Sequence, residues 1–195
     1  ITVKFRLREF ICGFFSNYFI KESLKSFLDL TINHSVFELL PFSSSFIDEN
    51  IQLPKGESVL IIAPHPDDEV IGLGGTIQLL KERKCEVHVV YVTTGQSEKK
   101  DKIQDEAISV CNLFDIQYTF LSSSPGTIDL TEGLKLERLI SELNIRQLFT
   151  TFLMDDHDDH KRVNQIIYKF IKDAYQLKIW MYQIYTSLPT NCIVD

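Results

Sequence analysis

Two acidic stretches of the sequence contain histidine and combine residue types that bind metal ions. The first is "PHPDDE", residues 64–69, and the second is "DDHDDH", residues 155–160. They hold three of the five histidines of the chain, His65, His157 and His160. Imidazole nitrogens with a carboxylate are suitable ligands for Zn²⁺, and a catalytic zinc site keeps a fourth position open for water. Because two histidines and one carboxylate also suit Fe²⁺, the pattern indicates a metal site and leaves the ion open between Zn²⁺ and Fe²⁺.

Each stretch also has an interpretation without function. Asp67, Asp68 and Glu69 precede an apolar helical pattern, and carboxylates at a helix N-terminus are favoured by about 0.3 to 1 kcal/mol each. Capping does not explain why His65 stands before them between two prolines. The second stretch has the alternative of a solvated, well-capped loop at the start of a helix. Taken alone, neither stretch decides between a structural and a functional role.

The apolar pattern around these stretches alternates between strands and helices. Residues 58–63, "SVLIIA", form a short continuous apolar run typical of a parallel strand that is covered on both faces. Further strands are predicted at 86–94, 117–121, 147–153 and 178–186, and helical spacing predicts helices around Val70–Leu80, Ile103–Phe114, Leu136–Leu143 and Val163–Ala174. This alternation predicts an α/β fold with a Rossmann-like, doubly wound, mostly parallel sheet.

The places of the two acidic stretches in such a sheet would bring them together. Ligands bind beyond the carboxyl ends of the strands, where the strand order reverses. With the common order 3-2-1-4-5, the first and fourth strands are neighbours at that point, and the acidic stretches follow these two strands. Carboxylates crowded into one crevice would raise each other's pKa unless a cation neutralised them. We therefore predict that residues about ninety positions apart in the sequence meet there around a metal ion.

The glycines Gly72, Gly74 and Gly75 offer a nucleotide-binding alternative, because glycine-rich turns before helices cradle phosphates. The acidic stretch just before them would repel a pyrophosphate. We therefore expect these glycines to allow close packing of a helix on the sheet.

The composition fits one soluble domain. The chain has 195 residues, of which 44% are hydrophobic and 24% are charged, and a domain of this size buries about 70% of its unfolded surface. The net charge of −7 argues against a nucleic-acid partner, which needs a basic surface. Four scattered cysteines without a CxxC pair indicate a reducing compartment, and we expect the cytoplasm. No apolar run approaches the roughly 18 residues of a transmembrane segment.

The first part of the chain differs from the rest. Residues 1–46 are rich in aromatic side chains interleaved with charged ones, at spacings that suit amphipathic helices. Two roles stay open for them: packing on the main domain or on an oligomer partner, and peripheral docking on a membrane surface. We expect an N-terminal helical extension at residues 1–50 and a single α/β domain at residues 51–195.

Three motifs in order resemble one known family. They are "APHPDDEVIGLGGTI" at 63–77, a strand ending in "VTTG" at 92–95, and "DDHDDH" at 155–160. Together they resemble the PIG-L/LmbE-like family of zinc-dependent N-acetylglucosaminyl de-N-acetylases, and the likeness runs from about Ser58 to the end. The family's late strand and loop normally continue further, so the resemblance implies a domain that lacks its C-terminal end.

The resemblance implies a role for six residues of the two acidic stretches. His65, Asp68 and His160 look like the zinc ligands, and Asp67 looks like the general base that deprotonates water. His157 is similar to the residue that stabilises the oxyanion or protonates the leaving amine, and Asp159 to the acid that orients this histidine.

The resemblance implies an enzyme, a zinc-dependent N-deacetylase acting on an N-acetylglucosamine-type sugar in a glycoconjugate or glycan precursor. The sequence also departs from the family. Ile103 stands where relatives commonly carry an arginine that helps to hold substrate, and "SPG" at 124–126 replaces the usual "PDG". These departures leave an alternative function open: a catalytically silent metal- and sugar-binding or scaffold protein of the same fold.

Overall fold

A computed structural model describes residues 52–94, 99–153, 155–170 and 177–185 of the chain. The predicted N-terminal extension at residues 1–50 lies outside these ranges. Cys85 and Cys111 are buried free cysteines, and the other two cysteines lie outside the described residues. None of the helices that the structure describes is long and apolar enough to cross a membrane.

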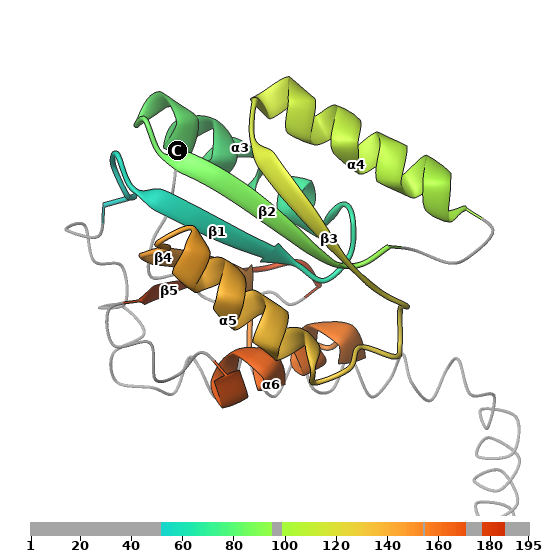
Figure 1. Ribbon diagram of the computed structural model, residues 1–195. Coiled ribbons are helices and arrows are strands. Elements are labelled where there is room, and N and C mark those ends of the chain that lie inside the picture. The colour runs from blue at the N-terminus through green and yellow to red at the C-terminus, as the bar shows by residue number, and fades with distance from the viewer. Residues whose placement is uncertain (1–51, 95–98, 154, 171–176, 186–195) are drawn as a thin grey trace, which may run out of the picture. The chain divides into compact units, whose positions relative to one another are not determined.

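The described residues form a domain around a sheet of five parallel strands (Figure 1). The strands are β1 (Ser58–Ala63), β2 (Glu86–Thr93), β3 (Gln117–Ser123), β4 (Gln147–Thr151) and β5 (Lys178–Tyr182). Their order is β3-β2-β1-β4-β5, as the sequence predicts. In the middle of the sheet, Ile61 of β1 pairs with Val89 of β2 on one side and Phe149 of β4 on the other.

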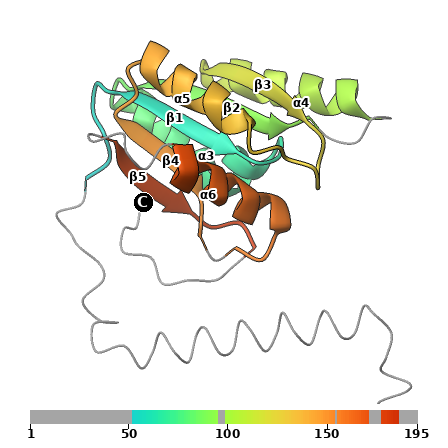
Figure 2. The same cartoon turned by 60° about the horizontal axis from the view of Figure 1, so that its bottom comes forward.

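In the part of the chain that the structure describes, four helices cover the two faces of the sheet (Figures 1 and 2). They are α3 (Asp68–Glu82), α4 (Lys100–Phe114), α5 (Glu132–Glu142) and α6 (Asp158–Phe170). One hydrophobic cluster joins the sheet to α3 and α4, and a second joins it to α5 and α6. Val59 and Ile61 of β1 belong to the first cluster, whereas Leu60 and Ile62 belong to the second. The continuous apolar run of β1 follows from this burial on both faces.

The elements next to the site begin and end at places that the apolar pattern does not mark. β4 ends at Thr151 and β5 at Tyr182, which is earlier than the apolar runs predict, because the pairing of these two strands stops at this residue pair. Helix α3 begins at Asp68 and α6 at Asp158, before their apolar stripes. The acidic stretches therefore supply the first turns of two helices.

Close packing of α3 on the sheet requires glycine at one position only. A Cβ atom on Gly72 would overlap the ring of Tyr182 in β5 and lie 2.9 Å from Cδ1 of Ile184. At Gly74 the nearest atom would be 3.8 Å away, and at Gly75 no atom would lie within 4 Å. The predicted packing role therefore holds for Gly72 and not for the two glycines that follow.

Candidate metal site and its acidic neighbours

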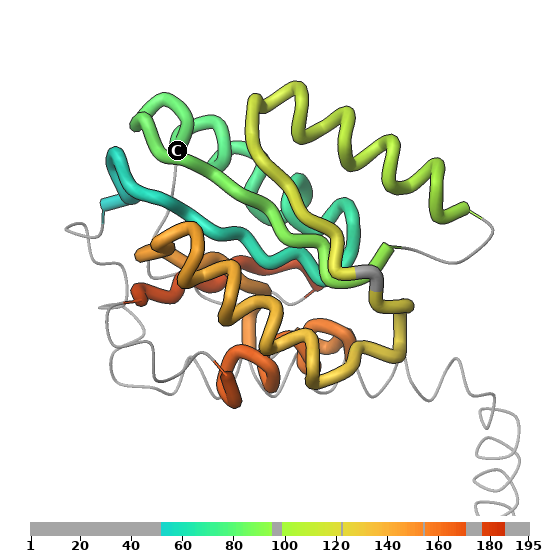
Figure 3. The backbone as a smooth tube through the Cα atoms, viewed as in Figure 1, coloured from blue at the N-terminus to red at the C-terminus, as the bar shows by residue number. Residues whose placement is uncertain are grey.

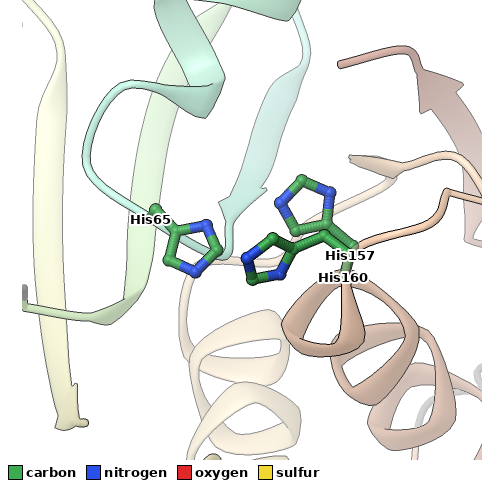
Figure 4. A group of neighbouring side chains, drawn as sticks. All are labelled: His65, His157 and His160. Carbon is green, nitrogen blue, oxygen red and sulfur yellow. The ribbon is translucent and has the colours of Figure 1, made fainter. Parts of the chain in front are cut away.

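The two acidic stretches meet at the carboxyl ends of β1 and β4, which are adjacent strands of the sheet. Figure 3 shows how the chain passes from β3 through α5 before it enters β4 beside β1. In Figure 4, His65 from the loop after β1 faces His157 and His160 from the start of α6. One ligand atom from each of these three side chains lies within 4.8 Å of the other two. Such a group could hold a metal ion.

Asp68 lies between two of these histidines. Its Oδ2 atom is 3.2 Å from Nδ1 of His65 and 3.2 Å from Nε2 of His160. Burial raises the pKa of Asp68, but the short contacts with the His160 and His65 rings outweigh it and lower the pKa to about 2. Burial likewise lowers the pKa of His160, but the carboxylates of Asp155 and Asp68 outweigh it and raise the pKa to about 9. Without a metal ion, the buried Asp68 and His160 therefore form a charged pair at neutral pH.

His65 and His160 each contact a further carboxylate through the second ring nitrogen. Nε2 of His65 is 2.9 Å from Oδ2 of Asp159, and Nδ1 of His160 is 3.2 Å from Oδ2 of Asp155. Despite these short distances, neither nitrogen of the fully buried His160 makes a well-directed hydrogen bond. Buried nitrogens without such a bond are rare in folded proteins. Here both nitrogens of His160 lie beside a carboxylate oxygen, and one of them is a potential metal ligand.

His157 has a different kind of partner. Its Nδ1 atom accepts a hydrogen bond of 3.1 Å from the main-chain N–H of Asp159. Because a main-chain N–H can only donate, Nδ1 carries no hydrogen, and in the neutral ring Nε2 carries it. Burial, followed by the positive charges of His65 and His160, lowers the pKa of His157. The ring is therefore neutral at pH 7, with Nε2 as a hydrogen-bond donor.

Asp67 lies at the start of α3 without capping it. Its side chain makes no capping hydrogen bond, and its main chain has φ 147° and ψ −26°. Burial and the neighbouring charge of Asp68 raise the pKa of Asp67, although His65 and His160 act in the opposite direction. The helix-capping interpretation therefore does not account for this carboxylate, which remains available to take up a proton.

The carboxylate of Asp159 has a different partner from the one expected by resemblance. It contacts His65 and also accepts hydrogen bonds from the main-chain N–H of Gly126, at 3.0 Å and 2.9 Å. Only the main chain of Asp159 bonds to His157. Gly126, in the "SPG" stretch after β3, has φ +76°, a conformation that favours glycine. The stretch that departs from the family pattern therefore contacts the site.

Two buried acids of the site were not among the site residues predicted from the sequence. Asp155 accepts hydrogen bonds from the main-chain N–H groups of His157, at 3.0 Å, and Tyr185, at 3.3 Å. Burial raises its pKa, but the contact with the His160 ring, followed by the main-chain hydrogen bonds, lowers it overall. Glu69, in the first turn of α3, is also fully buried. Asp155 lies near histidines and Glu69 lies at a helix start. Exposed acids are common at such places, so the sequence did not indicate that these two are buried.

One curated protein resembles part of the chain. It comes from Bacteroides thetaiotaomicron and is described as a glucosamine-6-phosphate deaminase-like protein. The two sequences are 55% identical over 42 residues, which is 22% of this chain and 6% of that protein. The chain thus spans only a small part of this relative.

The fold of this chain resembles those of several solved structures, and one family model matches its sequence. A deacetylase of the teicoplanin biosynthesis pathway has a TM-score of 0.58 at 13% identity, over 65% of this chain and 66% of its own. The N,N'-diacetylchitobiose deacetylase of Pyrococcus horikoshii has a TM-score of 0.54 at 21% identity, over 83% of this chain and 69% of its own. The family model described as PIG-L, GlcNAc-PI de-N-acetylase, matches residues 60–171, more than half of the chain. The chain therefore belongs to the PIG-L family.

Proposed function

We propose that this protein is a metal-dependent hydrolase that removes the N-acetyl group from an N-acetylglucosamine-type sugar in a glycoconjugate or glycan precursor. The membership of the family supports the reaction type, and the family description supports the sugar. The observation that carries the proposal is the difference among the three histidines. Two of them have carboxylates on both ring nitrogens, whereas the third has a main-chain donor on one nitrogen.

The proposed metal ligands are Nδ1 of His65, Oδ2 of Asp68 and Nε2 of His160. Ligand atoms about 2.0 to 2.2 Å from a tetrahedral Zn²⁺ lie roughly 3.3 to 3.6 Å apart, and Asp68 Oδ2 is 3.2 Å from both nitrogens. The second carboxylates support this assignment, because a histidine that binds metal commonly donates its other N–H to an acid. Asp159 would orient His65 in this way and Asp155 would orient His160. The same ligands would accept Fe²⁺.

His157 is better suited to bind the substrate than the metal. Although it belongs to the group of three histidines near one another, its accessible nitrogen, Nε2, carries a hydrogen in the neutral ring. We assign this N–H to the oxygen of the acetyl carbonyl, where negative charge develops during attack. Removing one such donor typically costs about 2.7 to 4 kcal/mol of transition-state stabilisation.

The proposed reaction is hydrolysis of the acetamide. A bound zinc ion would supply Lewis acidity and lower the pKa of water. Asp67 takes a proton from the water molecule as the water oxygen attacks the acetyl carbon. The raised pKa of Asp67 suits a general base. The C–N bond breaks when the amine nitrogen receives the proton that Asp67 took from water, while His157 keeps its N–H on the carbonyl oxygen. The products are acetate and the free amino sugar.

The Asp67→Asn variant tests this proposal. We expect it to keep its metal content, because Asp67 is not a proposed ligand, and to lose at least about 100-fold in kcat for acetate release from N-acetylglucosamine conjugates. The matched control is Asp158→Asn, which changes an exposed acid within the second acidic stretch and leaves activity intact. A wild-type protein that binds metal and sugar but releases no acetate would instead identify the catalytically silent alternative.

A further inference from the structure

Asp67 has an unusual main-chain conformation for its place in the fold. Within the described residues, the other non-glycine positions with positive φ are Lys84, Asp115 and Asn144, with φ between 48° and 64°. These three follow the ends of helices α3, α4 and α5, where a left-handed residue is common. Asp67 instead precedes a helix and has φ 147°. Such a conformation is costly and persists only where the surrounding structure enforces it.

The contact that enforces this conformation comes from Glu69. The main-chain N–H of Asp67 donates to Oε2 of Glu69, at 3.2 Å. The Asp67 carbonyl oxygen accepts the N–H groups of Val70 and Ile71, at 3.0 Å and 2.9 Å. The N–H and the C=O of Asp67 are thus both bonded to α3, which fixes the direction of its side chain.

Tyr91 in turn fixes the position of Glu69. Its hydroxyl group donates to the other carboxylate oxygen, Oε1, at 2.8 Å and lies 3.3 Å from Sγ of Cys111 in α4. The ring of Tyr91 is fully buried in β2 and stacks on Phe120 of β3, with 4.9 Å between the ring centroids. The sheet therefore holds the hydroxyl group in place beneath the first turn of α3.

The burial of Glu69 argues for a positioning role beyond helix capping. Its exposed fraction is 1%, although an exposed acid would stabilise a helix start equally well. Removing a carboxylate from water is expensive unless hydrogen bonds compensate. The Glu69 carboxylate is bonded to neutral donors, among them the Asp67 N–H and the Tyr91 hydroxyl.

We propose that Glu69 and Tyr91 are positioning residues that hold the main chain of Asp67, and thereby direct its carboxylate into the site. The value of this arrangement for catalysis rests on the proposed function, in which Asp67 takes the proton from water. A general base must lie within hydrogen-bond reach of that proton, and a misplacement of about 1 Å can cost about 100-fold in rate.

The test compares two pairs of variants with two readouts. The first readout is hydrogen exchange of the Asp67 amide in the metal-free protein, measured by NMR, which needs no activity. The second is kcat and KM for acetate release, together with metal content. Glu69→Ala removes both contacts, and Glu69→Gln keeps an oxygen that can accept the Asp67 N–H. Tyr91→Phe removes the hydroxyl group under Glu69, whereas Tyr182→Phe removes a buried hydroxyl group that donates to the carbonyl of Ile62.

We expect exchange of the Asp67 amide to rise about 100-fold in Glu69→Ala and about tenfold in Tyr91→Phe, with kcat falling by similar factors while KM and metal content stay unchanged. Glu69→Gln and Tyr182→Phe should stay within about threefold of wild type in both readouts. If the Asp67 amide exchange and the kcat of Tyr91→Phe both equal those of the wild-type protein, the proposal is overturned, even if Glu69→Ala fails to fold. Should no variant and no wild-type protein release acetate, the proposed function fails, and the exchange data alone decide the positioning of Asp67.

Discussion

Three buried aspartates share this site, and each is bound to a histidine. Asp68 lies between His65 and His160, Asp159 contacts His65 and Asp155 contacts His160. The same residue type therefore serves as a proposed ligand in one case and as the support of a ligand in the other two. The difference is one of place, because only Asp68 contacts both histidines through one oxygen.

The supporting acids can be tested by removing their charge. In Asp155→Asn or Asp159→Asn, the proposed ligand histidine faces a neutral amide in place of the charged acceptor that orients its ring, and we expect the affinity for Zn²⁺ to fall about 10- to 100-fold. Competition with a chelator of known affinity measures this change. Affinities equal to that of wild type in both variants would contradict the support that we assign to these acids.

The pH dependence of metal binding follows from His160. Its pKa of about 9 in the metal-free protein means that the ring is protonated at pH 7 and must lose this proton to bind metal. We expect the apparent dissociation constant to fall about tenfold per pH unit from pH 7 to pH 9 and to level off above that. Isothermal titration in buffers of different ionisation enthalpy would detect the released proton. A pH-independent affinity across this range would exclude His160 as a ligand.

At this scale, the sequence predicted which residues gather but not how they are connected. The histidines and Asp68 could be named because few side chains bind zinc. The connection of Asp159 to His65 could not, since it depends on how the loop turns at the start of α6. Asp155 was not predicted because its contact with His160 forms across the turn between them, which the residue types do not reveal.

At the scale of the elements, the position of α3 matters most, because its first turn carries Asp68 and the residue before it is Asp67. Gly72 lets this helix pack against Tyr182 of the edge strand β5. Strand and helix types could be predicted along the described part of the chain, since continuous apolar runs and helical stripes are distinct patterns. The bounds beside the site could not, because β4 and β5 end where their pairing stops, inside apolar sequence.

The packing of α3 predicts opposite effects of alanine at two glycines. Gly72→Ala places a methyl group against the Tyr182 ring, and we expect a loss of about 1 to 3 kcal/mol in the free energy of unfolding. Gly75→Ala meets no atom within 4 Å and should be neutral or stabilising by up to about 1 kcal/mol, because alanine favours a helix. Urea denaturation of both variants measures the difference. Equal stability of the two would show that α3 adjusts without cost.

At the scale of the whole molecule, the sheet order brings together parts that are distant in sequence. β1 and β4 are neighbours although β2 and β3 lie between them in the chain. The order 3-2-1-4-5 could be predicted because it is common among doubly wound sheets. A metal ion bound by residues after both strands would therefore link two halves of the chain.

This link predicts a large effect of metal on stability. A ligand that binds the folded state alone, at 100 times its dissociation constant, stabilises that state by about 2.7 kcal/mol. For a protein of this size we expect a rise in Tm of about 5 to 11 °C on adding Zn²⁺ to the metal-free protein. Calorimetry with and without a chelator measures it, and His160→Ala should lack the response. An equal rise in that variant would place the metal elsewhere.

The return of the chain from the sheet edge at β3 to the inner position of β4 has a consequence for how activity arises. A cut in the connection between these strands would leave one piece with His65 and Asp68 and another with His160. Each piece would carry an incomplete set of ligands, and hydrolysis would appear only after the two reassemble. Catalytic turnover of such a split protein would therefore report that β4 has inserted beside β1.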